Sequence, residues 1–407
     1  MDKIALIYVQ FPDSSPEIEQ KELEELIRTA QGEIALSFSQ KRNSIDPVSV
    51  IGFGKLEEIK SALEINEDIG VAIFSCNLSS TQRTYLKKTL NVDILDKIDL
   101  ILDIFALRAS SAEGKKQVEL AQLTYNLATR PEGDFSRQGA GIGTRGPGET
   151  KLELNKRLAR KRIHFLKQEL ERIEKQRQLT RKKRTANDMF TIALVGYTNA
   201  GKSTLFNRIT SDNVYADNLL FATLDATVRK CVLDCGIEVL FIDTVGFIRD
   251  LPHTLVNAFK STLEEATNAD LLLNICDISD RHVEEHIAVT EQLLAELNAS
   301  APLIRVYNKC DVSDISVADS CANKVLFVSA KTGQNVDVLL DTISHFVLQK
   351  YAKITLKATL FESGILLGKL HNYTNKFDIE YFDDYVLVHT TVRKEYVTQF
   401  TKYLHFC

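Results

Sequence analysis

Long apolar runs are missing from this sequence. None approaches the roughly 18 consecutive residues of a membrane span, so no transmembrane helix is expected. Met1–Ile4 is not a basic segment leading into a long apolar one, which disfavours a secretory signal. The seven cysteines are scattered, and Cys231 and Cys235 have no second pair or flanking histidine to complete a metal site. These absences favour free thiols in a reducing, cytoplasmic compartment.

Charge is distributed unevenly along the 407 residues. The composition is that of an ordinary globular protein, with 44% hydrophobic and 26% charged residues, and the length suffices for several domains. The formal net charge is only −5, yet residues 151–184 hold 14 basic and 4 acidic side chains. That segment therefore carries a charge of +10 and the rest of the chain one of −15. A basic arm on an acidic body is a pattern that any functional interpretation has to explain.

The N-terminal part has the pattern of a small α/β unit. Residues 4–9 and 71–74 are apolar runs of strand length, and residues 16–29 and 55–63 have helical spacing. Ile51-Gly-Phe-Gly-Lys55 is a glycine turn that opens a helix. A single Gly-x-Gly motif is a weak phosphate-binding signal, so whether this unit binds a second nucleotide such as ATP stays open.

A basic helical hairpin is expected next. Residues 113–129 predict one helix, which Pro131 ends, and residues 149–184 predict a second. The apolar positions of the second helix alternate spacings of four and three, as in a coiled-coil seam. They are Ala159, Ile163, Leu166, Leu170 and Ile173. Two helices joined by one loop predict an antiparallel hairpin with the loop at its tip. This loop contains two arginines and six glycines: Arg137, Arg145, Gly133, Gly139, Gly141, Gly143, Gly146 and Gly148.

Strand-like and helix-like runs then alternate, which predicts a mostly parallel sheet covered on both faces. The strand candidates are residues 191–195, 239–242, 271–276, 303–307 and 325–328. Near the C-terminus, residues 385–391 are the clearest strand. The expected fold class is α/β. The expected parts are an N-terminal α/β subdomain (1–112), a helical hairpin (113–187), a P-loop domain (188–349) and a small α+β domain (350–407).

The strongest motif is Gly196-Tyr-Thr-Asn-Ala-Gly-Lys-Ser203. It has the spacing of a phosphate-binding P-loop and lies between a predicted strand and a predicted helix, as a P-loop requires. Its glycines allow backbone N–H groups to surround the phosphates, and the following helix adds its dipole. Lys202 supplies charge to the β- and γ-phosphates, and Ser203 offers a hydroxyl to Mg²⁺.

Asn308-Lys-Cys-Asp311 is the motif expected to select guanine over adenine. It follows a predicted strand, at the edge of the sheet where open α/β folds bind ligands. The Asp311 carboxylate can accept from N1–H and the N2 amino group of guanine, a pair of donors that adenine lacks. Ser329-Ala-Lys331 ends the next strand and is expected to support the base. The sequence therefore predicts a GTP-binding G domain that hydrolyses GTP to GDP and phosphate.

Two further segments have the positions of switch loops. In Asp243-Thr-Val-Gly246, Asp243 is expected to hold Mg²⁺ through water and the Gly246 N–H to sense the γ-phosphate. Thr223 is the preferred second Mg²⁺ hydroxyl, with Thr227 the alternative. Phe247 stands where many GTPases have a glutamine that orients the attacking water. Whether or not Phe247 has only a packing role in the core, another group has to orient the water.

The expected site residues fall into three groups. The groups assigned to catalysis are Lys202, Thr223 and Gly246, and those assigned to the metal are Ser203, Thr223 and Asp243. The residues expected around the nucleotide are Gly196, Tyr197, Thr198, Asn199, Ala200, Gly201, Lys202, Ser203, Thr204, Asp243, Thr244, Val245, Gly246, Asn308, Lys309, Asp311, Ser329, Ala330 and Lys331. Asn199 stands where some GTPases that lack the glutamine use asparagine to coordinate K⁺, although a plain loop role is equally open.

The sequence resembles the HflX-type ribosome-associated GTPases over residues 1–350. The motifs outside the G domain that carry the resemblance are Gln117-Val-Glu-Leu-Ala-Gln-Leu123, Gly141-Ile-Gly-Thr-Arg-Gly-Pro-Gly-Glu-Thr150, Lys151-Leu-Glu153, Ile51-Gly-Phe-Gly-Lys-Leu-Glu-Glu58 and Leu102-Asp-Ile-Phe-Ala106. Phe221-Ala-Thr-Leu-Asp225 and Asp250-Leu-Pro-His253 match the switch regions of the family. Ala140 and Ala226 depart from an expected glycine and proline, and the tail after residue 350 matches poorly.

The resemblance implies a stress-linked, monomeric factor that binds the large ribosomal subunit and separates the ribosome into its subunits. The glycine loop would approach ribosomal RNA, which suits the charge of +10 on the hairpin. The residues expected to contact RNA are Arg137, Gly139, Gly141, Gly143, Arg145, Gly146, Gly148 and Lys151. The expected location is the cytoplasm, on ribosomes or peripherally on a membrane.

Two rival interpretations belong to other classes. A signalling switch with a protein effector would not need a basic hairpin. An enzyme subunit that modifies RNA would need a second catalytic constellation outside the G domain, and the sequence contains none that we recognise.

Overall fold

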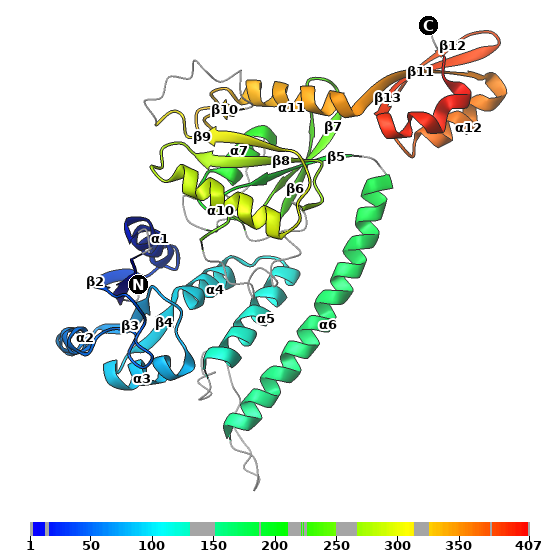
Figure 1. Cartoon of the computed structure of the whole chain (residues 1–407). Coiled ribbons are helices and arrows are strands. Elements are labelled where there is room, and N and C mark those ends of the chain that lie inside the picture. The colour runs from blue at the N-terminus through cyan, green and yellow to red at the C-terminus, as the bar shows by residue number, and fades with distance from the viewer. Residues whose placement is uncertain are drawn as a thin grey trace. The chain divides into compact units, whose positions relative to one another are not determined.

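The structure is a computed structural model of the whole chain. It describes residues 3–12, 16–130, 151–186, 189–210, 221, 223, 226–249, 267–312, 325–374 and 377–405, without the side chains of 151–152, 177–186 and 325. The chain forms two compact units. The first unit joins Met1–Arg172 with Ala216–Asp225 and Val245–Leu263, and the second joins Ile173–Tyr215, Ala226–Thr244 and Glu264–Cys407. Figure 1 shows the helices and strands of both units.

A parallel sheet forms the base of the first unit. Its strands are β1 (Lys3–Gln10), β2 (Glu33–Lys41), β3 (Ile69–Phe74) and β4 (Asp93–Asp96), in the order β2-β1-β3-β4. Its helices are α1 (Pro16–Thr29), α2 (Phe53–Ile65), α3 (Ser80–Leu90) and α4 (Lys97–Arg108). One core buries apolar side chains of α2 and α3 against β1 and β3, and α1 contacts α4 on the other face. The strands and helices expected in this part are all present.

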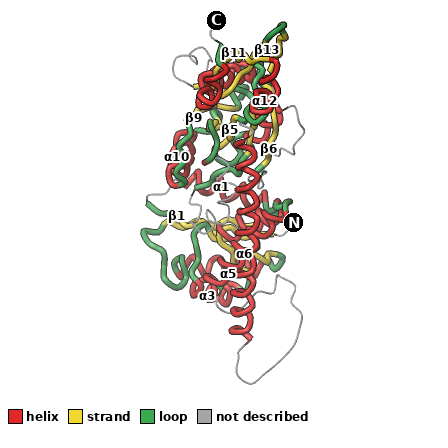
Figure 2. Tube along the Cα trace, turned by 90° about the vertical axis from the view of Figure 1, so that its right-hand side faces the viewer, coloured by secondary structure: helices red, strands yellow, loops and turns green. Residues whose placement is uncertain are grey.

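The two hairpin helices also exist. They are α5 (Ala112–Thr129) and α6 (Lys151–Ala186), and they run side by side in Figures 1 and 2. Leu123, Ala159 and Leu166 are buried at their interface, where the predicted seam residue Ile163 also packs. Arg162 forms a two-pronged ion pair with Glu119 of α5, at 2.6 and 2.8 Å. The seam spacing therefore predicted the packing face of α6 correctly.

A six-stranded sheet forms the centre of the second unit. Its strands are β5 (Phe190–Val195), β6 (Thr227–Val232), β7 (Glu238–Asp243), β8 (Leu271–Asp277), β9 (Leu303–Asn308) and β10 (Val325–Phe327). The spatial order is β10-β9-β8-β5-β7-β6, and all neighbours are parallel except the edge pair β6 and β7. The strands that follow β5 go first to one side of it and then to the other. The carboxyl end of β5 is thus the topological switch point, where ligands bind in such sheets.

Helices cover both faces of this sheet, as the alternating pattern predicted. α7 (Lys202–Thr210) and α11 (Val336–Lys350) bury Leu205, Phe206, Leu339 and Ile343 in the core with Ile192 of β5. α10 (Val283–Glu296) packs on the opposite face, where its Ile287 meets side chains of β8 and β9. The predicted α/β fold class is confirmed.

The C-terminal segment forms a three-stranded antiparallel sheet in the order β11-β13-β12. These strands are β11 (Tyr351–Thr359), β12 (Phe377–Tyr381) and β13 (Tyr385–Arg393). Helix α12 (Leu360–Leu370) and the 3-10 segment η2 (Lys394–Tyr403) pack on one face. Arg393 joins this sheet to the central one through a two-pronged pair with Asp270, at 3.1 Å for each prong. Among the described helices, none combines the length and apolarity that a bilayer crossing requires.

Candidate nucleotide site

The phosphate loop turns at the carboxyl end of β5. Gly196 and Gly201 have φ angles of 143° and 92°, which side chains other than hydrogen strongly disfavour. A Cβ on Gly196 would lie 2.3 Å from the Ile275 carbonyl oxygen, and one on Gly201 would lie 2.2 Å from Asn308 Nδ2. Both glycines are therefore required by conformation and by close contacts.

Lys202 is the first residue of α7, and its side chain is buried within the loop. Its Nζ donates to the carbonyl oxygens of Gly196 and Tyr197, at 3.1 and 2.8 Å. Burial lowers the pKa of Lys202 to about 8, against the charge of Asp243, which raises it. An anionic phosphate at this place would favour the protonated ammonium, because an opposite charge stabilises the charged form.

Ser203 and Asp243 meet at the opening of the loop. Ser203 Oγ donates to Asp243 Oδ2 at 2.7 Å, and Asp243 lies at the end of the buried strand β7. The hydroxyl and the carboxylate are hard oxygen ligands of the kind that Mg²⁺ takes together with nucleotide phosphates. Within the described residues, no cluster of three or more histidine, cysteine or acidic side chains could hold a metal ion by itself. A Mg²⁺ ion at this pair would therefore depend on the phosphates for further ligands.

Asn308 connects the phosphate loop to the guanine loops. Its Nδ2 donates to the Ala200 carbonyl at 2.9 Å, and its Oδ1 accepts from the Ala330 backbone N–H at 2.9 Å. Asn308 is buried, so both polar ends of its amide need hydrogen-bond partners. The partners come from two loops that the sequence had assigned to one site. The structure thus brings together the Gly196–Ser203 loop, Asn308 and Ala330.

Asp311 is exposed two residues after a backbone turn at Lys309, whose φ is 64°. Lys309 Nζ pairs with Asp277 Oδ2 at 2.6 Å, and the Ile278 N–H donates to the Asn308 carbonyl at 3.1 Å. These bonds hold the Asn308–Asp311 loop on the segment after β8. Sequence reasoning missed Asp277, although its place directly after a strand, at the same sheet edge, was an available signal.

The Ser329–Lys331 loop is fixed by its own hydrogen bonds. Ser329 is fully buried, and its backbone N–H donates to the Gln334 carbonyl at 3.0 Å. Arg208 of α7 donates to the Lys331 carbonyl at 2.9 Å. The loop that was expected to support the base is thereby attached to the helix that follows the phosphate loop.

The switch residues 221, 223 and 245–249 belong to the first unit, whereas Asp243 and Thr227 belong to the second. Phe221 is buried and meets Phe105 of α4 edge to face, with ring centroids 4.6 Å apart. Lys97 donates to the Arg249 carbonyl at 3.2 Å. Thr223 and Gly246 belong to the same unit, so their expected roles at Mg²⁺ and the γ-phosphate stay predictions. Phe247 is buried at 2% exposure, and its ring has no polar atom with which to orient water.

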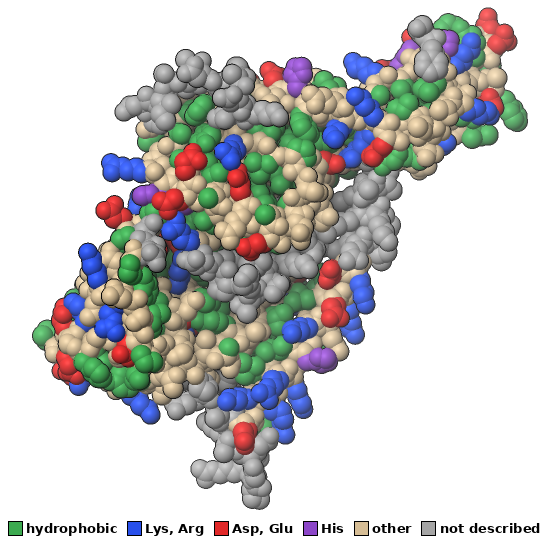
Figure 3. Space-filling model, in the orientation of Figure 1, with side chains coloured by type: hydrophobic (Ala, Val, Ile, Leu, Met, Phe, Trp, Pro, Cys, Tyr) green, Lys and Arg blue, Asp and Glu red, His purple; other side chains and the backbone are tan. Residues whose placement is uncertain are grey.

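The expected RNA contacts from Arg137 to Gly148 lie outside the described residues, as does the side chain of Lys151. The described part of α6 nevertheless exposes a row of basic side chains, which Figure 3 shows in blue. The exposed basic residues are Arg157, Arg160, Lys161, Arg162, Lys167, Arg172 and Lys175. Arg162 pairs with Glu119 and Arg172 with Glu169, and all seven basic side chains remain exposed.

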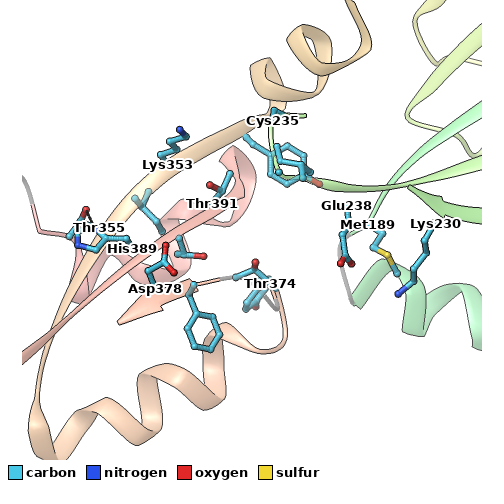
Figure 4. A pocket seen from close by; sticks show the side chains of 17 residues that line it. Met189, Lys230, Cys235, Glu238, Lys353, Thr355, Thr374, Asp378, His389 and Thr391 are labelled. Carbon is cyan, nitrogen blue, oxygen red and sulfur yellow. Dashed lines mark hydrogen bonds between the residues drawn. The ribbon is translucent and has the colours of Figure 1, made fainter. Parts of the chain in front are cut away.

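A separate cavity of about 880 Å³ lies between the β6–β7 turn and the C-terminal sheet (Figure 4). Thr355, Thr391 and His389 line one side, and Lys230 and Glu238 line the other. None of the residues assigned to the nucleotide lines it. The cavity therefore contributes nothing to the candidate site.

Replacing Asp311 by asparagine is expected to change the preferred base from guanine to xanthine, which has a carbonyl where guanine has its amino group. GTP affinity should fall by about 10- to 100-fold, the equivalent of one hydrogen bond to a charged group. Competition of GTP and XTP against a fluorescent GDP would measure this. Asp341→Asn, at an exposed position of α11, is the matched control. Unchanged GTP affinity in Asp311→Asn would refute the base assignment.

Three family models match successive parts of the chain. They are described as the GTP-binding GTPase N-terminal region over residues 17–106, the GTP-binding GTPase middle region over residues 108–184, and the 50S ribosome-binding GTPase over residues 191–309. The third match includes the phosphate loop, Asp243 and Asn308.

Several curated proteins are similar over most of their length. The GTPase HflX of Caldanaerobacter subterraneus subsp. tengcongensis is 49% identical over 335 residues, which cover 81% of this chain and 78% of that protein. The GTPase HflX of Escherichia coli K12 is 41% identical over 366 residues, covering 88% and 85%. Among solved structures, a complex of SsGBP with GDP has a TM-score of 0.49 and 26% identity over 85% of this chain and 99% of that chain.

Proposed function

The chain belongs to the HflX family of GTPases, and we propose that it uses GTP hydrolysis on the large ribosomal subunit to separate ribosomes into their subunits, under stress. The hydrolysis itself, of GTP to GDP and phosphate, is the activity of its family. The observation that supports binding to the ribosome is the row of exposed basic side chains along α6, the second helix of the hairpin. A row of exposed cations suits RNA phosphates, which protein effectors do not present.

The end of α5 that leads into the hairpin loop is held by a buried charge network. Tyr125 of α5 donates to Asp96 at 2.5 Å, and Arg130, at the end of α5, pairs with Asp99 at 3.1 Å. Arg83 pairs with both carboxylates, at 2.7 Å to Asp96. Burial and the Asp96 charge raise the pKa of Tyr125, so it remains a neutral donor. These contacts support a stiff arm that could transmit a load between RNA and the first unit.

In the proposed reaction, Lys202 and the backbone N–H groups of residues 196–203 bind the β- and γ-phosphates. Ser203 and Asp243, with Thr223, would hold Mg²⁺, which neutralises charge on the phosphate oxygens when bound. Gly246 would donate its N–H to the γ-phosphate. Asp311 would select guanine, while Asn308 keeps the two loops in register. Since Phe247 cannot orient the water, we assign that task to a group ordered by the ribosome.

Ribosome separation is the direct test of this function. Intact ribosomes mixed with the chain and GTP should show falling light scattering as subunits separate, and sucrose gradients should place the chain with large subunits. A non-hydrolysable GTP analogue should favour the bound state. The signalling-switch alternative predicts no cosedimentation with either subunit, and that outcome would remove the ribosomal proposal while leaving the GTPase intact.

A potassium ion is a further candidate for this site. Asn199 is held at a φ of 62° within the phosphate loop, a conformation that asparagine tolerates better than most side chains. We expect hydrolysis to be faster in KCl than in NaCl. A K⁺ ion next to the phosphates would place positive charge where negative charge develops in the transition state. Turnover measured at equal ionic strength compares the two salts. Equal rates would leave Asn199 as a loop residue.

A further inference from the structure

The second residue of the phosphate loop makes an aromatic stack outside the loop. The ring of Tyr197 lies on the imidazole of His286 in α10, with centroids 3.8 Å apart and planes 8° apart. Tyr197 is 7% exposed, so the contact lies in the interior of the second unit. No motif in the sequence pointed to His286, because it stands about ninety residues further along the chain.

The imidazole is in turn held by an acidic side chain. His286 Nδ1 lies 3.5 Å from Asp280 Oδ2, and Asp280 Oδ1 accepts from the His282 backbone N–H at 2.9 Å, at the start of α10. Asp280 belongs to the same turn as Asp277, whose carboxylate pairs with Lys309 of the guanine loop. The turn at the end of β8 therefore contacts both loops of the nucleotide site. Asp277 pairs with Lys309 of the guanine loop, and Asp280 pairs with His286, which stacks on Tyr197 of the phosphate loop.

The backbone of Tyr197 is part of the phosphate cradle. Its carbonyl accepts from Lys202 Nζ at 2.8 Å and from the Ala200 N–H at 3.4 Å. A Tyr197 ring that is fixed against α10 limits the rotation of this peptide and hence the directions of the neighbouring N–H groups. A non-glycine residue with a positive φ keeps that conformation only where surrounding contacts determine it, and Asn199 of this loop has a φ of 62°.

We infer that His286 is a positioning residue for nucleotide binding: it holds the phosphate loop in its binding conformation by stacking on Tyr197, and Asp280 orients its ring. The inference rests on the assignment of Gly196–Ser203 as the phosphate site. It adds to the proposed function a residue of α10 that lies outside the phosphate loop.

The expected effect is on affinity more than on the chemical step. Aromatic pairs contribute beyond their buried area, so His286→Ala should weaken GDP and GTP binding by about 2- to 12-fold. The change should appear mainly in KM, with a smaller change in kcat, because the side chain does not reach the reacting atoms. His286→Phe keeps a ring on Tyr197 and should restore most of the affinity. Gln292→Ala, at an exposed position of the same helix, is the matched control.

A double-mutant cycle between Tyr197 and His286 is the decisive experiment. Fluorescent GDP is titrated into the full-length chain and its Tyr197→Ala, His286→Ala and doubly substituted variants, without ribosomes. If the stack acts as inferred, His286→Ala has little further effect once Tyr197 is alanine. Additive effects, or no effect of either His286→Ala or Asp280→Asn, would overturn the inference.

The same titration separates this inference from the site assignment. If Lys202→Ala removes tight binding while His286→Ala has no effect, only the role of His286 fails. If Lys202→Ala also binds normally, the phosphate site itself is wrong. Should His286→Ala fail to fold in a thermal melt, His286→Phe and Asp280→Asn decide the question. Weak binding by His286→Phe, equal to that of Tyr197→Ala, would also count against a role for the stack.

Discussion

Replacing Lys202 by alanine should reduce GTP hydrolysis by at least about 10³-fold, because it removes the buried cation expected at the β- and γ-phosphates. The ammonium is enclosed by the loop that it would serve, since Gly196 and Tyr197 accept its hydrogen bonds. Single-turnover hydrolysis of radiolabelled GTP gives the required dynamic range.

Two further variants give this experiment its controls. Ser203→Ala removes the hydroxyl that meets Asp243 and should also abolish turnover, through loss of the metal rather than of the phosphate contact. Raising the Mg²⁺ concentration should therefore rescue Ser203→Ala more than Lys202→Ala. Lys230→Ala removes an exposed lysine of β6 and should hydrolyse GTP at the normal rate. Normal turnover in Lys202→Ala or Ser203→Ala would contradict the site.

The sequence was sufficient for the elements that obey local rules. The phosphate loop follows from glycines whose positions are now explained by φ angles of 143° and 92° and by contacts with Ile275 and Asn308. The packing face of α6 followed from its apolar spacing, because seam residues such as Ala159 and Leu166 recur every three or four positions. Both patterns lie within short stretches of chain, where geometry is fixed by neighbours in sequence.

Contacts between distant segments could not be predicted in this way. The buried cluster of Arg83, Asp96, Asp99 and Tyr125 unites side chains from α3, β4, α4 and α5, and the sequence alone would place each of them on the surface. The stack of His286 on Tyr197 is of the same kind. Such pairs depend on which faces meet after folding, and periodicity identifies a face but not its partner.

Large ribosomal subunits are expected to accelerate GTP hydrolysis by this chain. With Phe247 buried and apolar, the position that holds a glutamine in many GTPases supplies no group to orient water, so the basal rate should be slow. G proteins without their partners turn over at about 10⁻⁴ to 10⁻² per second, and a partner can add roughly 10³- to 10⁵-fold. The partner has to be held near the switches, and the exposed cations of α6 suit that task. Stimulation should therefore fall steeply with salt, since each neutralised phosphate releases counterions.

Deleting residues 139–148 tests whether the hairpin loop transmits this stimulation. The deletion leaves the phosphate loop and Lys202 untouched, so basal hydrolysis should survive while stimulation is lost.

Reversing charge on the arm, for example with Arg160→Glu and Lys161→Glu, should weaken stimulation at low salt, because both side chains are exposed and their charge would then repel phosphates. Glu153→Gln, an exposed acidic position at the start of the same helix, is the matched control, and it should bind at least as well as the intact chain. If subunits fail to accelerate hydrolysis, or accelerate the deletion variant equally, then the arm does not couple RNA to the GTPase. A loss of stimulation that leaves cosedimentation intact would instead place the loop in activation alone, with the cations of α6 providing the attachment.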